Sequence, residues 1–190
     1  TNQLVACLAG LPYVRVIGAD KQLLTTSIQE AHRLNSAYIE NTDFFKNLLI
    51  PAIAFDEKRP VDRHKFVSAI ARFDVGCLLH GVFLESIAGV LRLPRALSSF
   101  IEAEGVNRVN TGGVKNDRVQ PGKDEESGKT AAEGFGNVPF HRTEFVAERI
   151  TAYFNVDLEQ LRSYRLGANL ERLLLALSLF KIQKFLSSGL

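Results

Sequence analysis

The stretch HGVFLESIAGVLRLPRALSSFIEAEGVNRVNTGGVKNDRV, residues 80–119, determines the fold we expect. Its apolar run from Val82 to Ile87 predicts a buried strand. Pro94 then stands where a helix can begin, apolar side chains follow at helical spacing, and Gly105 is a natural helix end. A Gly-Gly turn at residues 112–113 comes next. The stretch therefore predicts a strand, a helix and a polar loop in close succession.

The Gly-Gly turn carries a group of donors typical of an anion-binding loop. Gly112 and Gly113 can take backbone angles that other residues avoid, so a ligand can approach the backbone closely. Lys115, Asn116 and Arg118 supply cationic and amide donors directly afterwards, which suits a phosphate or a nucleic-acid backbone. A solvated surface loop is the competing interpretation.

This polar loop closes at GFGNVPFHR, residues 134–142, where His141 and Arg142 add two further donors. Between the two ends, residues 119–133 are poor in apolar side chains and rich in Gly, Ser, Lys and Glu, which predicts a flexible excursion. Its tip contains Asp-Glu-Glu, which repels phosphate. We therefore expect one domain over residues 1–190, with a flexible insertion at about 110–139 and contact with phosphate or a nucleic-acid backbone at its two bases.

Five separated blocks of the chain resemble the repeated backbone subunit of type I-U (or I-G) CRISPR interference complexes, a member of the RAMP superfamily. The resemblance runs from about Leu11 to Leu190 and implies a subunit that binds CRISPR guide RNA. The implied partners are copies of itself along the RNA, other subunits of the complex, and target DNA through guide pairing. The blocks are LLHGVFLES, RLPRALSSFIEAEGV, GGVKNDRV, GFGNVPFHR and ITAYFNVDLEQL.

The resemblance also implies the fold, an α+β RNA-recognition-motif-like (ferredoxin-like) palm with a long loop insertion and additional helices. Such a palm has a four-stranded antiparallel sheet with two helices on one face. Family members carry one strand before Thr1 and another after Leu190, so we expect this chain to be an incomplete fragment.

Arginines outside the loop are further candidates for RNA contact. Arg92 and Arg95 flank the helix expected at Pro94, where a helix N-terminus could meet phosphate. An ion pair with Glu102 or Glu104 is an equally good explanation for them. Arg33 is a weaker candidate, on the polar edge of a helix expected over residues 27–39.

The remaining pattern predicts two strands and several helices. The stretch at 149–156 fits both a helix and a strand, and its β-branched and aromatic residues favour the strand. We expect the last helix to be buried, because it is apolar almost all round, and its uncharged run is far short of the roughly 20 residues of a membrane span. Strands are predicted at 14–17 and 149–156, and helices at 27–39, from 44 to near 51, 63–74, 157–164 and 168–186.

Composition excludes several classes of protein. A hydrophobic content of 46% is enough for a core, and a net charge of +2 is too small to indicate a nucleic-acid binder without a local basic site. Cys7 and Cys77 are far apart and predict no disulfide scaffold. We therefore expect a cytoplasmic protein with no membrane contact.

Catalytic patterns are weak throughout. The four histidines show no metal-binding spacing, Cys77 and His80 form only an isolated CxxH, and no dinucleotide motif is complete. Asp117 is the one acid in the candidate RNA loop, and we interpret it as structural. We expect no metal, no cofactor and no enzymatic activity. The alternative is a soluble enzyme that binds a phosphorylated small molecule through its Gly-rich loops.

Overall fold

The computed structural model of the chain describes residues 8, 10–56, 58–85, 87, 91–116 and 137–188. The chain divides into two compact units: residues 1–99 with 154–190, and residues 100–153. We call them the core unit and the ribbon unit. The flexible segment expected at 119–133, and with it Asp117 and Arg118, lies outside the described residues.

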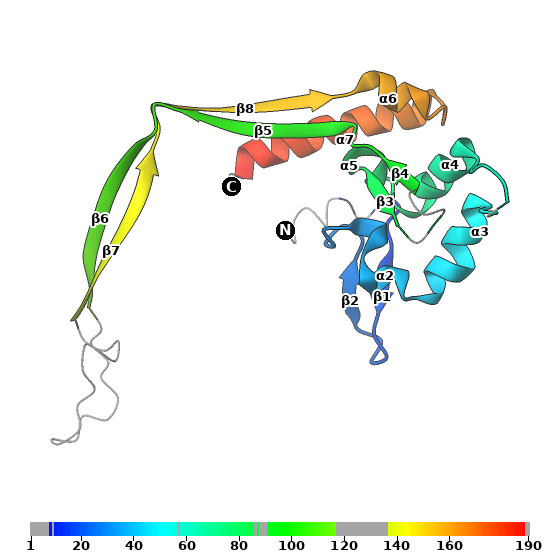
Figure 1. Cartoon of the computed structure of the whole chain (residues 1–190), viewed down its shortest axis with the longest axis horizontal. Helices are drawn as coiled ribbons and strands as arrows, with labels where there is room; N and C mark the ends of the chain where they lie inside the picture. The colour runs from blue at the N-terminus through cyan, green and yellow to red at the C-terminus, as the bar shows by residue number, and fades with distance from the viewer. Residues whose placement is uncertain are drawn as a thin grey trace, which may run out of the picture. The chain divides into compact units, whose positions relative to one another are not determined.

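Strands and helices are mixed along the chain, which confirms the predicted α+β class (Figure 1). The described strands form four two-stranded sheets, so the four-stranded sheet of an RNA-recognition-motif-like palm stays a prediction. The pairs are β1 (Arg15–Ile17) with β2 (Leu23–Thr26), β3 (Val82–Leu84) with β4 (Leu91–Leu93), β5 (Leu97–Glu104) with β8 (Arg149–Val156), and β6 (Asn107–Asn116) with β7 (Asn137–Val146).

The described helices lie in the core unit. Two of them, α4 and α7, are long, and the others are single turns or short helices, of which η1 is a 3-10 helix and η2 a π-helix. They are η1 (Arg33–Asn35), α2 (Ala37–Glu40), η2 (Phe45–Leu49), α3 (Ile50–Ile53), α4 (Arg63–Phe73), α5 (Cys77–His80), α6 (Leu158–Ser163) and α7 (Ala168–Ser188).

Helix α4 confirms the prediction at 63–74, and its N-terminus shows why it begins there. The carboxylate of Asp62 accepts from the backbone N–H groups of His64 and Lys65 at 2.9 and 3.1 Å. These bonds satisfy donors that the first helical turn leaves unpaired. Phe66 and Ile70, which are four residues apart and so one helical turn apart, then lie on the buried face.

The helix predicted over residues 27–39 is wrong, because long-range bonds hold its first residues. Ser27 exchanges two hydrogen bonds with Val14, one through each residue's N–H, and this extends the β1–β2 hairpin. Turns follow, and Ser36 caps only the short helix α2. The helix predicted to end near Pro51 also differs, since it continues to Ile53 with Pro51 in the first turn of α3.

The helix predicted after Pro94 is wrong as well, since residues 97–104 form strand β5. Their apolar spacing fits a helix, but pairing with β8 imposes an extended backbone. Phe100 stacks on Tyr153 of β8, with ring centroids 4.5 Å apart and planes 18° apart. The strand predicted for β8 at 149–156 is confirmed. Tertiary pairing therefore overrides local pattern in this segment.

The prediction of a turn at Gly112 and Gly113 is also wrong, because both residues lie inside strand β6. They pair with His141 and Phe140 of β7. A Cβ on Gly113 would lie 3.1 Å from the ring of Phe140, and one on Gly112 would lie 2.9 Å from Nδ1 of His141. The two glycines therefore make room for large side chains of the partner strand.

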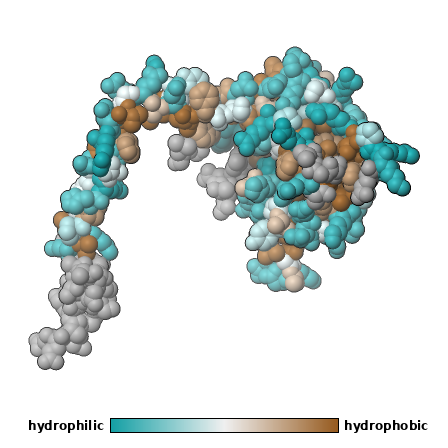
Figure 2. All heavy atoms as spheres, in the orientation of Figure 1, coloured by the Kyte–Doolittle hydropathy of each residue, from teal (hydrophilic) through white to brown (hydrophobic). Residues whose placement is uncertain are grey.

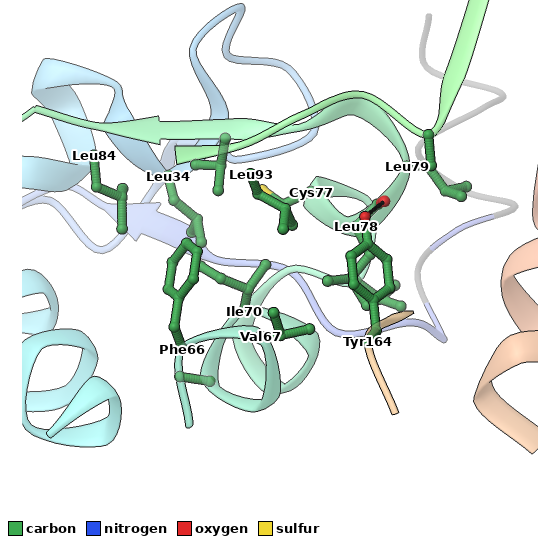
Figure 3. Packing of buried hydrophobic residues seen from close by; sticks show 14 of the residues in the cluster. Leu34, Phe66, Val67, Ile70, Cys77, Leu78, Leu79, Leu84, Leu93 and Tyr164 are labelled. Atoms are coloured by element: carbon green, nitrogen blue, oxygen red, sulfur yellow. Dashed lines mark hydrogen bonds between the residues drawn. The ribbon is translucent and has the colours of Figure 1, made fainter. Parts of the chain in front are cut away.

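The hydrophobic core lies in the core unit (Figure 3). Side chains of α4, β3 and β4, such as Phe66, Leu84 and Leu93, pack toward one another. The hydroxyl of Tyr164 reaches this core and donates to the carbonyl oxygen of Leu78 at 2.8 Å. The last helix, expected to be buried because it is apolar almost all round, has one buried face only, and Leu179 on α7 is exposed.

Candidate nucleic-acid interface

A cavity of about 780 Å³ in the core unit brings three of the predicted RNA-binding residues together. Arg33, Arg92 and Arg95 all line it, although Arg33 is far from the other two in the sequence. Its walls are residues 30–35 around η1, the end of α5, strands β3 and β4, and the segment from Pro94 to Ser99. A volume of this size suits a ligand of a few hundred daltons.

Arg92 and Arg95 are the exposed cations of this cavity. Within the described part of the chain, neither guanidinium forms an ion pair. Glu104, one of the acids considered as their partner, instead pairs with Arg149 in the ribbon unit at 2.5 Å. The donors of both arginines are therefore available for an anion.

Arg33 is built into the cavity wall. Its Nη2 lies 2.5 Å from Oδ1 of Asp74, and the two side chains are 12% and 1% exposed. Its Nε donates to Sγ of Cys77 at 3.4 Å. A Cβ on Gly76 would lie 2.3 Å from Nη2 of Arg33, so only glycine leaves room for the guanidinium there. The charge of Arg33 is thus largely committed to Asp74.

His80 lies in the wall beside Lys181, which approaches from α7. The Nζ of Lys181 lies 2.6 Å from Nε2 of His80. An ammonium only donates, so Nε2 accepts and the ring proton is on Nδ1. Burial, with the positive charges of Lys181, Arg33 and Arg95, lowers the pKa of His80 to about 3. Burial, with the charge of Arg33, lowers the pKa of Lys181 to about 8.

Glu30 is the acid of the cavity wall. Hydrogen bonds from the hydroxyls of Thr25 and Ser36 lower its pKa, so its carboxylate is charged at neutral pH. Asp74 neutralises Arg33, and Glu30 offsets one further charge. Arg92, Arg95 and the Lys181 behind the wall leave the cavity positive, which favours an anionic ligand.

The segment that carries Arg95 is fixed by three hydrogen bonds from distant residues. The N–H of Ala96 donates to the carbonyl of Leu79 at 2.9 Å, and the carbonyl of Ala96 accepts from the N–H of Asp157 at 2.8 Å. Nε2 of Gln160 donates to the carbonyl of Pro94 at 2.7 Å. The backbone beneath Arg95 is therefore held before any ligand arrives.

Gly81 and Gln160 are positioning residues that the sequence pattern did not single out. Gly81 has φ of +77°, and a Cβ there would lie 2.7 Å from the carbonyl oxygen of Leu93. A glycine between a helix and a strand is the signal that could have found the first. Nothing local marks Gln160, because it acts on Pro94, 66 residues away.

The ribbon unit holds the other predicted residues on two faces. Successive side chains of a strand point to opposite faces, so His141 and Arg142 lie on different sides of the β6–β7 ribbon. Lys115 shares the face of Arg142, according to the register of the two strands. Arg142 pairs with Glu144 at 2.6 Å and donates to Thr111 at 3.3 Å. Asn116 is the last residue of β6.

The structure thus brings Arg33, Arg92 and Arg95 together in the core unit. In the ribbon unit it places Lys115 and Arg142 on one face, but Lys115 pairs with Val138 and Arg142 with Thr111, so the two lie apart along the strands. Among the residues that the structure describes, no group of three or more His, Cys, Asp or Glu side chains could hold a metal ion.

None of the helices in the described ranges combines the length and the apolarity needed to cross a membrane. No curated protein matches the chain. The model of one protein family, described as CRISPR-associated protein GSU0053, matches residues 1–108, which include η1, strands β3 and β4, and both exposed arginines of the cavity. Because this match covers more than half of the 190 residues, the chain belongs to the CRISPR-associated protein GSU0053 family.

Proposed function

We propose that this protein is a non-catalytic subunit that binds CRISPR guide RNA and assembles in copies along it, in a type I interference complex. The observation that carries the proposal is the positive cavity with Arg92 and Arg95, in a chain of a CRISPR-associated family. In this role the subunit displays the guide for pairing with target DNA, beside other subunits of the complex. The proposed compartment is the cytoplasm, where such a guide is present.

The chemistry of the cavity favours an RNA backbone as ligand. Guanidinium groups bind phosphate oxygens through paired, charge-assisted hydrogen bonds. Contacts to phosphate are independent of base sequence. A repeated subunit requires such contacts, because each copy faces different guide bases. Arg92 and Arg95 come from β4 and from the segment that Gln160 holds, so both lie on fixed backbone.

A purely binding role also agrees with the state of His80. A general acid or base works best when its pKa lies near the pH of the reaction. The pKa of His80 is lowered to about 3 by burial and by nearby cations, so this ring keeps one protonation state at neutral pH. Because Gly112 and Gly113 lie in β6, the Gly-Gly turn supports neither the alternative, a phosphate-binding enzyme with Gly-rich loops, nor an RNA-binding loop, and the proposal rests on the cavity instead.

The ribbon unit supplies a second contact surface in this proposal. Its exposed side chains include both cations and large apolar groups, which Figure 2 shows as alternating hydrophilic and hydrophobic patches. Phe145 is 70% exposed and Phe140 is 46% exposed. Two-stranded ribbons are marginally stable alone, so a surface of this kind gains from contact with RNA or a neighbouring copy.

The test compares RNA binding by the parent protein and by an Arg92→Ala, Arg95→Ala double variant. Binding is measured by the fluorescence anisotropy of a labelled single-stranded RNA over a range of salt concentrations. Each lost phosphate contact lowers the slope of log K against log salt by about 1, so we expect the double variant to lower it by about 2. The loss should be equal for RNAs of different sequence. Thermal unfolding of each variant shows that its fold is retained.

The matched control is an Arg59→Ala, Arg72→Ala double variant, which removes the same charge from exposed positions outside the cavity. It should bind RNA nearly as the parent protein does. Equal losses in both double variants would show that only net charge matters and would contradict the proposed site. Size-exclusion chromatography with and without guide RNA then tests assembly, since a ladder of copies should form only with RNA.

A further inference from the structure

Phe83 is a large aromatic side chain whose exposure the core does not explain. It is 41% exposed, whereas its neighbours in β3, Val82 and Leu84, are 6% and 0% exposed. The alternation of a strand places those neighbours in the core and Phe83 on the opposite face. An isolated exposed aromatic would be unremarkable, but Phe83 lines the same cavity as the two exposed arginines.

The strand register places Phe83 directly opposite Arg92. The two residues are Cα partners in the antiparallel β3–β4 pair, so both side chains stand on the same face of this small sheet. Arg95 lies three residues after Arg92 and lines the same cavity. An apolar ring and two phosphate-binding groups are therefore presented together.

The ring of Phe83 has no aromatic or cationic partner within the described residues. The described aromatic pairs are those of Phe44 with Phe73, Phe100 with Tyr153, and Phe154 with Phe185. Cation–ring contacts of the described part involve Phe73 and Phe180. Both the ring of Phe83 and the guanidinium of Arg92 are thus left for a ligand that is flat and apolar on one side and anionic on the other.

Single-stranded nucleic acid has this combination in each nucleotide, a base with an apolar face attached to a charged phosphate. Proteins that bind it without sequence preference combine a positive groove with aromatic side chains on which bases stack. Every base has such a face, so stacking tolerates any guide sequence. The cavity volume of about 780 Å³ lies within the range of pockets that hold ligands of nucleotide size.

We infer that Phe83 is a stacking platform for one base of the bound RNA, while Arg92 and Arg95 hold the phosphates beside that base. This inference rests on the proposed function, since it assigns a second kind of contact to the same cavity. The inference adds a second recognised group to the proposed function: the arginines bind the charged phosphates, whereas Phe83 stacks on the flat face of a base.

The chain contains no tryptophan, which permits a direct test. A Phe83→Trp protein has a single indole, which lies at the proposed stacking position. Indole fluorescence can be excited at a wavelength that does not excite tyrosine. We expect unlabelled single-stranded RNA of mixed sequence to quench this fluorescence. The control is Leu48→Trp, at a position that is 54% exposed in η2 and does not line the cavity, and its fluorescence should stay unchanged.

Affinity measurements on two further variants separate the ring from its bulk. Phe83→Leu keeps an apolar side chain but removes the ring, and should weaken RNA binding at least about fivefold, the loss typical of one stacked base. Phe83→Tyr keeps the ring and should restore the parent affinity. An RNA of equal length with abasic sugars should bind the parent protein and Phe83→Leu equally, because neither can stack on it.

The results of these experiments distinguish failure of the stacking inference from failure of the proposed function. Parent-like affinity of Phe83→Leu, with no quenching in Phe83→Trp, overturns the stacking platform and leaves the arginine contacts in place. Equal quenching in Phe83→Trp and Leu48→Trp overturns it too, since the signal would not belong to the cavity. Absence of any RNA binding by the parent protein overturns both the inference and the proposed function.

Discussion

Arg33 and Asp74 form an ion pair of 2.5 Å that is almost completely enclosed by the core unit. Oδ2 of Asp74 accepts no hydrogen bond within the described residues, while Oδ1 accepts from Arg33 and from the N–H of Gly76. A single carboxylate oxygen of Asp74 therefore binds the guanidinium of Arg33 and also stabilises the turn before α5. The pair joins η1 to the loop after α4, and so fixes one wall of the cavity.

We predict that Asp74→Ala lowers the free energy of unfolding by about 3–5 kcal/mol, because it leaves the buried charge of Arg33 without a partner. Chemical denaturation measures this loss. Asp56→Ala is the matched control, since Asp56 pairs with Arg59 at 3.5 Å on the surface and such pairs contribute only about 0–1 kcal/mol. Losses of similar size in the two variants would contradict the enclosed pair.

We predict that the stability of the protein rises with pH in two windows. The pKa of His80 is lowered to about 3 by burial and by Lys181, so between about pH 3 and 6.5 only the unfolded chain binds this proton. The pKa of Lys181 is lowered to about 8, chiefly by burial, so between about pH 8 and 10.5 the unfolded chain again holds more protons. Each depressed pKa makes the folded state less stable below its window.

Lys181→Met tests the upper window, because it removes the titrating group and keeps an apolar side chain of similar length. The increase in the free energy of unfolding between pH 8 and 10.5 should become smaller in this variant. Chemical denaturation at a series of pH values measures both curves. Parallel curves for the parent and the variant would show that Lys181 has an ordinary pKa in the folded protein.

We predict that Gly81→Ala costs about 1–3 kcal/mol, because φ of +77° is strained for a side-chained residue and the new Cβ would meet the carbonyl oxygen of Leu93. The variant should also weaken RNA binding, since the displaced backbone leads directly to Arg95. Gly10→Ala is the control, with no atom within 4 Å of its added Cβ. Thermal unfolding and RNA anisotropy are measured on both, and an unaffected Gly81→Ala would be the contrary result.

We predict that Lys115→Ala combined with Arg142→Ala weakens RNA binding more than His141→Ala does, because the first two residues share one face of the ribbon. Exposed substitutions of this kind cost at most about 0.5 kcal/mol of stability, so thermal midpoints should stay close to that of the parent. Lowering of the salt slope by about 2 is expected for the double variant. Normal affinity would mean that Arg142 serves only its pair with Glu144.

Local signals in the sequence predicted the elements whose causes are local. The spacing of Phe66 and Ile70 was enough for α4, and the β-branched and aromatic residues of 149–156 were enough for β8. Arg92 and Arg95 were predicted as donors at a helix start, but Arg92 lies in β4 and Arg95 in the segment before β5, and their contact with RNA stays a prediction.

The errors fall where distant residues decide the local conformation. Ser27 belongs to a hairpin because of Val14, and residues 97–104 are extended because β8 lies beside them. Gly112 and Gly113 read as a turn, but the side chains of Phe140 and His141 explain them as positions of close packing. The role of Phe83 depends on its register with Arg92, which a single sequence does not contain.

The insertion of the ribbon between two halves of the core has a consequence for the order of synthesis. Residues 1–99 leave the ribosome before α6 and α7 exist, yet Leu78, Ala96 and Pro94 have their partners in Tyr164, Asp157 and Gln160. Contacts between residues so far apart in the sequence form late, and they lower the rate of folding. The backbone on either side of Arg95 therefore gains its bonds from Asp157 and Gln160 only after the whole ribbon has been translated, which makes this support one of the last parts of the fold to form.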